Sequence, residues 1–219
     1  SKPEITATSK PEITATSKSG KTSTSKYAKY GFKLYIRDPN VFNRTGKNDV
    51  KRAREWKSIV KEAAKYYELP ENLLWATMKT ESNFINNIIL KKSNARGLMQ
   101  LKVKTFSGVT GIKRTDPKIF TKIMDARENI FAAAKLMDLN REYFNNNIIQ
   151  MISAYHAGSG GTRIGIQNSV GGFNNRSKIP SQPNIISNKS ERTKVYVDRV
   201  LNKYYEYNEN YLFQSDSSD

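Results

Sequence analysis

Glu81 occupies a position at which a carboxylate can serve as an acid. Leu74, Thr77, Met78 and Glu81 are spaced at i, i+3, i+4 and i+7, so a helix over this segment places all four on one face. Burial on an apolar face favours the protonated form of a carboxylate. A carboxylic acid that stays protonated near neutral pH can give its proton to a leaving oxygen. The alternative is a glutamate near a helix end whose carboxylate only reaches into solvent.

Glycoside cleavage by such an acid usually needs a second carboxylate. Glu71 precedes Glu81 by ten residues, which is about 15 Å along a helix. Asp116, Asp125 and Glu128 lie in or beside an expected loop, and the sequence does not place them. The residues alone therefore identify one candidate acid and no convincing partner for it.

Two more motifs follow Glu81-Ser82 along the chain. They are Gly97-Leu98-Met99-Gln100 and Ala154-Tyr155-His156-Ala157-Gly158. Three such motifs in this order and at this spacing are specific, and between about Trp56 and Tyr205 the chain resembles the soluble lytic transglycosylase family. That family has a lysozyme-like domain and cleaves the glycan strands of peptidoglycan. The resemblance implies a mainly α, lysozyme-like fold.

The resemblance also implies a mechanism with a single catalytic glutamate, Glu81. Lytic transglycosylases cleave the β-1,4 bond between N-acetylmuramic acid and N-acetylglucosamine. The C6 hydroxyl of the muramic acid closes onto C1 and gives a 1,6-anhydro product. In this scheme Glu81 acts first as the acid and then as the base.

Three residues beside Glu81 are candidate substrate contacts. Ser82 could orient the carboxylate by a hydrogen bond, or simply be a small polar residue at a helix end. Met99 could offer an apolar surface to a sugar ring, or fill the core. Gln100 could bond sugar hydroxyl or acetamido groups, or tie down a neighbouring loop.

Three later residues complete the candidate site. Tyr155 could place its hydroxyl beside Glu81, or be a half-buried core aromatic. His156 stands where the family usually has Asn, and adds a possible charge near pH 6.5. Tyr196 lies in Arg192-Thr193-Lys194-Val195-Tyr196-Val197, which replaces the family's Glu-Thr-x-x-Tyr-Val, and could still reach the cleft.

The charge implies an anionic partner without identifying it. The chain has 37 Lys+Arg against 20 Asp+Glu, a net charge of +17. Anionic wall polymers, peptidoglycan carboxylates, lipid headgroups and nucleic acid all fit such an excess. The basic residues look scattered and no nucleic-acid-reading motif is present, so specific nucleic-acid binding is not expected.

Composition excludes several classes of site. The chain has no cysteine and one histidine, which rules out disulfides and argues against a zinc site, so neither metal nor cofactor is expected. No apolar run approaches the roughly 18 residues of a transmembrane helix. The opening Ser1-Lys2-Pro3-Glu4 is not a signal peptide, so export would need another route unless a leader has been removed.

The sequence divides into four parts. Residues 1–26 hold a tandem octapeptide in Ser-, Thr- and Lys-rich sequence and are expected to be a disordered basic tether. Residues 27–48 are expected to pack loosely on a lysozyme-like domain over residues 49–208. Residues 209–219 form a tail that resembles a viral-protease site used in protein expression, with Tyr211 and Leu212 transposed.

Roughly six helices are expected in the domain. They include a helix from Trp56, the helix carrying Glu81, a short helix near Gly97, and helices over 125–144, 148–157 and around Val197. Residues 88–95 are expected to form a loop or short ribbon. Residues 104–122 and 160–188 contain Gly and Pro and are expected to be loops.

Two alternative functions remain open. The same scaffold would be a hydrolytic muramidase if water replaced the C6 hydroxyl, and product chemistry separates the two. A non-catalytic, basic wall-binding protein is the second alternative, against which Glu81 argues. The expected location is the cell envelope or a phage virion, between which the sequence does not decide.

Overall fold

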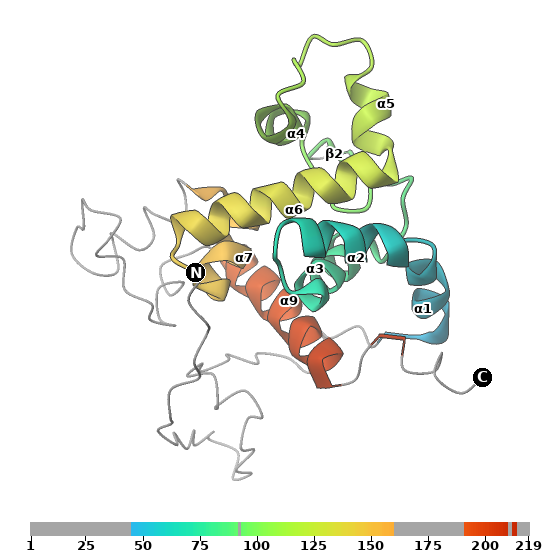
Figure 1. Cartoon of the computed structure of the whole chain (residues 1–219), viewed down its shortest axis with the longest axis vertical. Helices are drawn as coiled ribbons and strands as arrows, with labels where there is room; N and C mark the ends of the chain where they lie inside the picture. The colour runs from blue at the N-terminus through green and yellow to red at the C-terminus, as the bar shows by residue number, and fades with distance from the viewer. Residues whose placement is uncertain (1–44, 92, 160–190, 210–211, 214–219) are drawn as a thin grey trace, which may run out of the picture. The chain divides into compact units, whose positions relative to one another are not determined.

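The structure, a computed structural model, describes residues 45–91, 93–159, 191–209 and 212–213. These residues form eight helices and one antiparallel ribbon of two strands (Figure 1). The elements are α1 (Lys47–Arg54), α2 (Lys57–Tyr66), α3 (Glu71–Ser82), β1 (Ile89–Leu90), β2 (Ala95–Arg96), α4 (Val103–Thr110), α5 (Ile119–Met124), α6 (Ala126–Tyr143), α7 (Ile148–Ala157) and α9 (Glu191–Glu209).

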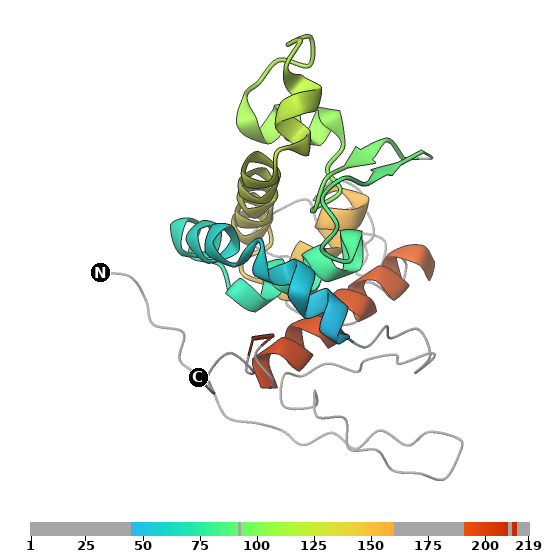
Figure 2. The ribbon, with the colours of Figure 1, turned by 90° about the vertical axis from the view of Figure 1, so that its right-hand side faces the viewer.

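Helix α3 is the most deeply buried element. Its residues from Leu73 to Met78 are almost completely enclosed. It packs against α2 and α9, while α6 contacts α2 and α7, and α7 also contacts α9 (Figure 2). The helix that carries Glu81 is therefore held on several sides by other helices, and the prediction of a mainly α domain is confirmed.

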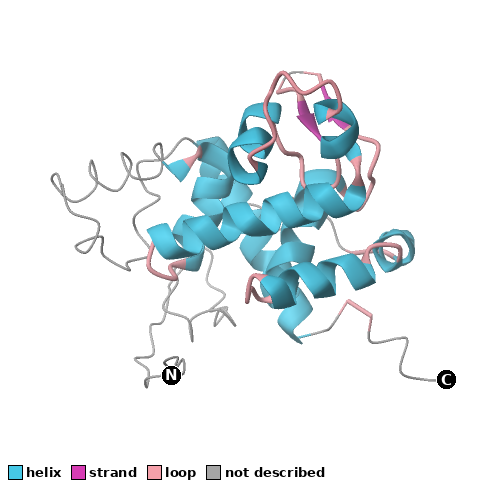
Figure 3. Cartoon of the chain, turned by 45° about the horizontal axis from the view of Figure 1, so that its top comes forward, coloured by secondary structure: helices cyan, strands magenta, loops and turns pink. Residues whose placement is uncertain are grey.

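Most of the helices predicted from apolar spacing are present. Helices α6 and α7 begin and end within one residue of the predicted positions, α3 carries Glu81 as predicted, and α9 carries Val197 in the core. Residues 88–95 contribute to the β1–β2 ribbon, in which Ile89 pairs with Arg96 (Figure 3). This ribbon is the only strand structure in the described part of the chain.

The predicted loop over residues 104–122 is wrong, because this segment contains α4 and most of α5. Gly111, with φ of 79°, ends α4 rather than preventing it. Phe106 and Ile119 are buried as α4 and α5 pack on α6. Tertiary packing therefore supports two short helices in a sequence whose glycines and proline suggested a loop.

The predicted helix at Gly97 is also absent. Residues 97–100 form a turn instead, and the next helix starts at Val103. Gly97 has φ of 75° and Gln100 has φ of 47°, and neither value is compatible with a right-handed helix. The motif residues Met99 and Gln100 are thus held on a tight turn.

Part of the C-terminal tail packs in the core. Leu212 and Phe213 are buried, and the ring of Phe213 lies 5.3 Å from that of Trp75 on α3. The predicted tether over residues 1–26, most of the 27–48 extension and the loop over residues 160–188 lie outside the described residues. Residues 47 and 48, at the end of the predicted 27–48 extension, are the first two residues of α1. The predicted domain bounds stay predictions.

Candidate active site

Glu81 lies on the last turn of α3 and is paired with Tyr196 of α9. The Tyr196 hydroxyl donates a hydrogen bond of 2.7 Å to Glu81 Oε1. Tyr196 is itself buried, and it lines a small apolar cavity together with Thr77 and Tyr155. The carboxyl group of Glu81 therefore lies in mainly apolar surroundings and accepts one hydrogen bond, from Tyr196.

This environment makes Glu81 a weak acid. Burial raises the pKa of Glu81 from 4.5 to about 7, although the hydrogen bond from Tyr196 acts in the opposite direction. Because Oε1 accepts from Tyr196, the acidic proton belongs on Oε2. The sequence predicted a protonated carboxylic acid here, and the geometry supplies one near neutral pH.

Tyr155 and His156 of α7 lie around this pair. The Tyr155 hydroxyl donates 2.7 Å to the backbone oxygen of Met99, and the negative charge of Glu81 contributes to its raised pKa after burial. The His156 ring stacks on Tyr196 with centroids 4.4 Å apart. Glu81, Tyr155, His156 and Tyr196 are thus brought together from three helices.

The pKa of His156 is lower than its usual value. Burial is the largest cause, followed by the positive charges of Arg192 and Lys102. The charge expected near pH 6.5 therefore develops only at lower pH. At neutral pH His156 is a neutral ring stacked on the tyrosine that contacts Glu81.

A buried asparagine of α6 holds the motif turn in place. Asn129 Oδ1 accepts from the Met99 amide at 2.8 Å, and its Nδ2 donates to the backbone oxygens of Arg96 and Ile123 at 3.2 and 2.8 Å. A Cβ on Gly97 would lie only 2.7 Å from Asn129 Nδ2. Gly97 is required because the asparagine side chain occupies the space that any larger residue would need.

Gln100 and Met99 both have structural contacts. Gln100 Nε2 donates to the backbone oxygens of Ile88 and Gly97 at 3.2 and 2.8 Å, which ties down the loop before β1. Its Oε1 is buried and has no hydrogen-bond partner in the described part of the chain. The Met99 side chain is fully buried, which fits the core-filling alternative better than a sugar platform.

Ser82 does not orient the carboxylate as suggested from the sequence. Its hydroxyl donates to the backbone oxygen of Met78 at 3.2 Å, one turn back on α3. Serine at a helix end commonly bonds its own helix in this way. Direct substrate contacts of Ser82, Gln100, His156 and Tyr196 stay predictions.

Among the described residues, no second carboxylate contributes to the pKa shift of Glu81. Burial raises that pKa and the hydrogen bond from Tyr196 lowers it. Glu71, the upstream candidate, instead accepts a hydrogen bond of 3.0 Å from Trp75 Nε1. Among the described residues there is also no group of three or more His, Asp or Glu side chains that could hold a metal ion.

Charged residues on the far side of α3 fix the chain just after Glu81. Asp49 of α1 binds Lys79 Nζ at 2.6 Å, and Lys79 also bonds the Asn83 side chain. Arg52 pairs with Asp49 and donates to the Asn83 backbone oxygen at 3.0 Å. Asn83 and Phe84 both have positive φ, so this network stabilises a turn of two left-handed residues.

No motif in the sequence indicates the roles of Asn129 and Asp49. Asn129 was expected only to belong to the start of a helix. It lies on the same stripe as Ile130 and Ala133, and an amide on a buried stripe must find partners. A polar residue among buried apolar ones is therefore the feature of the sequence that could have indicated the role of Asn129. The pairing of Asp49 with Lys79 spans 30 residues and leaves no local pattern in the sequence.

Comparison with known proteins agrees with this geometry. The family model of the transglycosylase SLT domain matches residues 58–173, more than half of the chain. Membrane-bound lytic murein transglycosylase C of Mannheimia succiniciproducens is 33% identical over 118 residues. That alignment covers 50% of this chain and 33% of the relative, so the chain spans about a third of that protein's length.

Two solved structures share the fold. An inactive mutant of the lytic transglycosylase Slt from Pseudomonas aeruginosa matches with a TM-score of 0.56 and 23% identity over 70% of this chain and 24% of that one. The 70 kDa soluble lytic transglycosylase of Escherichia coli matches with a TM-score of 0.58 and 22% identity, over 71% and 24% of the two chains. With the family model covering most of the helices around Glu81, the chain belongs to the transglycosylase SLT domain family.

Proposed function

We propose that this protein is a lytic transglycosylase that cleaves the glycan strands of peptidoglycan. The observation that carries the proposal is the Glu81 carboxyl, whose pKa of about 7 leaves it substantially protonated at neutral pH. The absence of any acidic influence on it among the described residues fits a reaction with one catalytic carboxyl group. Membership of the family and the name of the murein transglycosylase relative support the choice of substrate.

The reaction uses Glu81 twice. Its Oε2 proton passes to the glycosidic oxygen as the bond to C1 of N-acetylmuramic acid breaks. The resulting carboxylate takes the proton of the C6 hydroxyl, whose oxygen bonds to C1. The product is a 1,6-anhydro sugar, no water is consumed, and Glu81 ends protonated as it began.

Tyr196 and Tyr155 position the reacting groups. Tyr196 holds Oε1 and so directs Oε2 toward the bound sugar. Tyr155 braces the turn that carries Met99 and Gln100. The Oε1 of Gln100 is buried without a hydrogen-bond partner among the described residues, so a sugar contact of Gln100 needs the motif turn to open.

The proposed partners are peptidoglycan strands and anionic wall polymers, and the proposed location is the cell envelope. A phage virion would expose the enzyme to the same substrate. No helix in the described segments is long and apolar enough to span a bilayer.

Mass spectrometry of digested peptidoglycan tests the proposal. The purified protein should release muropeptides ending in 1,6-anhydro-muramic acid, which are lighter by one water than hydrolysis products. Glu81→Gln should keep the fold and lose at least about 1,000-fold in rate, because the amide cannot donate the required proton. Hydrated ends would indicate a muramidase. Wild-type activity in the Gln variant would contradict the assignment of Glu81, and an inactive wild type would favour a wall-binding protein.

A further inference from the structure

The basic residues look scattered along the sequence, but within the described part of the chain the excess of positive charge lies mainly in one segment. Residues 91–122, here called the basic lobe, include β2, the motif turn, α4 and most of α5. The lobe carries nine lysines and arginines against a single acid, Asp116, and so supplies nearly half of the net charge of +17. The cations are Lys91, Lys92, Arg96, Lys102, Lys104, Lys113, Arg114, Lys118 and Lys122.

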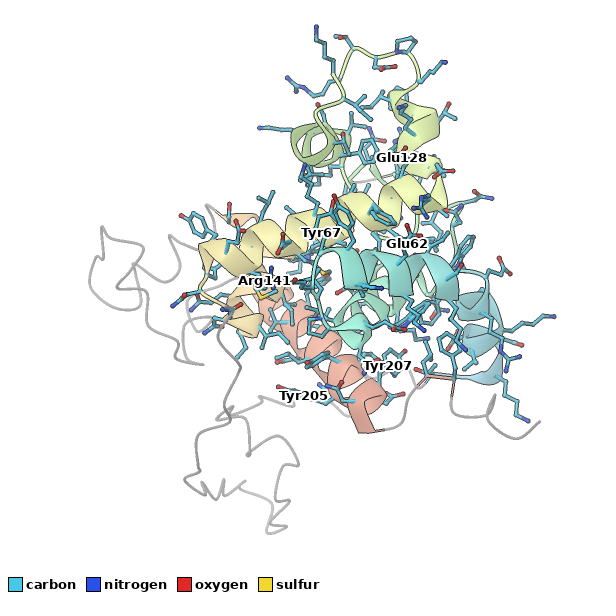
Figure 4. All side chains as sticks on the ribbon, viewed as in Figure 1. Glu62, Tyr67, Glu128, Arg141, Tyr205 and Tyr207 are labelled. Atoms are coloured by element: carbon cyan, nitrogen blue, oxygen red, sulfur yellow. The ribbon has the colours of Figure 1, made fainter. Side chains whose placement is uncertain are left out.

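The lobe projects from the first half of α6, on the side away from α2 and α3 (Figure 1). Six of its cations are exposed, and none of the eight described lobe cations forms an ion pair with another described residue. The exposed cations are Lys91, Lys102, Lys104, Lys113, Arg114 and Lys118. In the other described helices acidic residues accompany the cations; Glu62 on α2, labelled in Figure 4, pairs with Arg127 of α6.

The lobe reaches the candidate active site at its first helix. Lys102 directly follows the motif turn and caps the start of α4. It is close enough to His156 for its charge to affect that ring, and His156 stacks on the tyrosine that contacts Glu81. A polymer lying on the lobe would therefore extend to the entrance of the site.

The chemistry of the lobe argues against a membrane surface. The apolar residues of α4 and α5, including Phe106, Val109, Ile119 and Ile123, are buried against the domain and cannot insert into lipid. Phe120 is the only large apolar side chain exposed on the described part of the lobe, and Arg96 lies over its ring. Apart from Ile89 and Leu90 on the adjoining strand β1, which are exposed, the lobe thus offers charge with little apolar surface.

The number and type of cations favour a polymer with many regularly repeated anions. A single peptide of a peptidoglycan strand has only a few carboxylates, fewer than the exposed cations. Most of the cations are lysines, which bind phosphate as point charges and do not require a fixed bidentate geometry. We propose that the basic lobe is a docking surface for a wall-linked phosphodiester polymer, which would hold the enzyme beside its substrate. The inference rests on the proposed function for its biological setting.

Binding to a defined polymer tests the proposal. The probe is poly(glycerol phosphate) of about 20 repeats, titrated against the full chain at several salt concentrations. The test variant replaces Lys104, Lys113, Arg114 and Lys118 with Gln. The matched control replaces Lys47, Lys51, Lys61 and Lys65, four exposed lysines of α1 and α2, and so has the same net charge.

The lobe variant should bind the polymer at least about tenfold more weakly at 0.1 M salt. The slope of log affinity against log salt concentration should be smaller by about 2 to 4, because fewer counterions are released when phosphate contacts are lost. The control should change less than about threefold. Equal losses in both variants would overturn the proposal, since net charge alone would then explain binding. Matching thermal unfolding of the two variants checks that the fold is intact.

Two further probes separate the other anionic partners. The Glu81→Gln protein is titrated with peptide-bearing glycan chains and with vesicles containing phosphatidylglycerol. Tighter, lobe-dependent binding to either probe than to poly(glycerol phosphate) would overturn the assignment of the polymer. Glu81→Gln should bind the polymer like the wild type. Lobe-dependent polymer binding by a protein that proves inactive would contradict the proposed function without affecting this inference.

Discussion

The hydrogen bond from Tyr196 to Glu81 has opposite effects on geometry and on acidity. It holds Oε1 at 2.7 Å and so fixes the direction of the acidic proton. It also stabilises the charged carboxylate and lowers a pKa that burial raises. The resulting pKa of about 7 is a balance between these two influences.

Tyr196→Phe should disturb that balance in a predictable direction. Loss of the donor should raise the pKa of Glu81 further, so the fall of activity at alkaline pH should move upward by up to about one pH unit. The maximal rate should drop because the carboxyl group is less well oriented. A pH–rate profile for kcat measures both effects.

Tyr155→Phe is the control for this experiment. The Tyr155 hydroxyl donates to the Met99 backbone and not to Glu81. The alkaline limb of the pH–rate profile of Tyr155→Phe should therefore move much less. An unmoved limb in Tyr196→Phe would mean that the hydrogen bond does not set the acidity of Glu81.

Glu81 should also make stability depend on pH. The pKa of Glu81 is about 7 in the folded protein, against its ordinary value of 4.5, so between pH 4.5 and 7 the folded state binds more protons than the unfolded state. The contribution of Glu81 therefore lowers the free energy of unfolding as pH rises from 4.5 to 7. Glu81→Gln should therefore be more stable than wild type at pH 8 by up to about 3 kcal/mol. The difference should vanish near pH 4. Urea unfolding at the two pH values measures it, and equal stabilities at pH 8 would contradict a buried carboxylate.

At the scale of elements, α1 is important because it holds the end of α3. Burial alone would raise the pKa of Asp49, but the hydrogen bond and charge of Lys79, with help from Gly46 and Arg52, lower it below its usual value. Lys79 is itself buried. The ion pair between α1 and α3 is therefore an internal one, in which each charge depends on the other.

Asp49→Leu should lower the free energy of unfolding by about 3–5 kcal/mol, because it leaves Lys79 charged and unpaired inside the protein. The double variant with Lys79→Met should recover at least half of this loss, since it removes the stranded charge. Urea denaturation of the two proteins measures the difference. If the double variant were as unstable as the single one, the hydrogen bond from the Gly46 amide to Asp49 would be the important contact.

The exposed ion pair between Arg127 and Glu62 provides the comparison. Arg127→Gln should have a far smaller effect, because both side chains of that pair are hydrated. A loss as large as that of Asp49→Leu would show that burial is not what distinguishes the two pairs.

The sequence predicted the long helices well and the short elements poorly. Apolar spacing defined α3, α6 and α7, because each has a buried stripe long enough to detect. Helices α4 and α5 were missed because Gly108, Gly111 and Pro117 suggested a loop, and only packing on α6 stabilises them. The turn at Gly97 depends on a hydrogen-bonding side chain 32 residues later, which no local pattern reveals.

The sequence predicted which residues come together in the candidate site better than it predicted their hydrogen bonds. Glu81, Tyr155, His156 and Tyr196 do come together, as the motifs indicated. The direction of each hydroxyl could not be read from the sequence, and Ser82 bonds its own helix while Tyr155 bonds the Met99 backbone. Such details depend on which acceptor lies nearest after folding.

At the scale of the whole described domain, its C-terminal residues pack beside the helix that carries Glu81. Phe213 is buried against Trp75, and Lys57 of α2 lies 4.6 Å from its ring centroid. Tyr207, near the end of α9 (Figure 4), is hydrogen-bonded to Thr45 at 2.9 Å, just before α1. The first and last described segments are therefore both attached to the domain.

Phe213→Ala should lower the free energy of unfolding by about 3 kcal/mol through the cavity that it leaves. Phe120→Ala, which truncates a half-exposed ring, should cost well under about 1 kcal/mol. Thermal and urea unfolding compare the two. Equal small effects would mean that residues after α9 do not contribute to the fold.

The two tryptophans give this protein a built-in optical reporter. Trp56 Nε1 donates to the backbone oxygen of Phe84 at 3.1 Å, and the Trp75 ring stands 6.0 Å from the Phe84 ring. Both indoles therefore sense the same left-handed residue, three positions after Glu81. The chain contains no other tryptophan, so its tryptophan fluorescence comes from the immediate surroundings of that turn. Emission wavelength and quenching would then follow a rearrangement at the end of α3, without any attached dye.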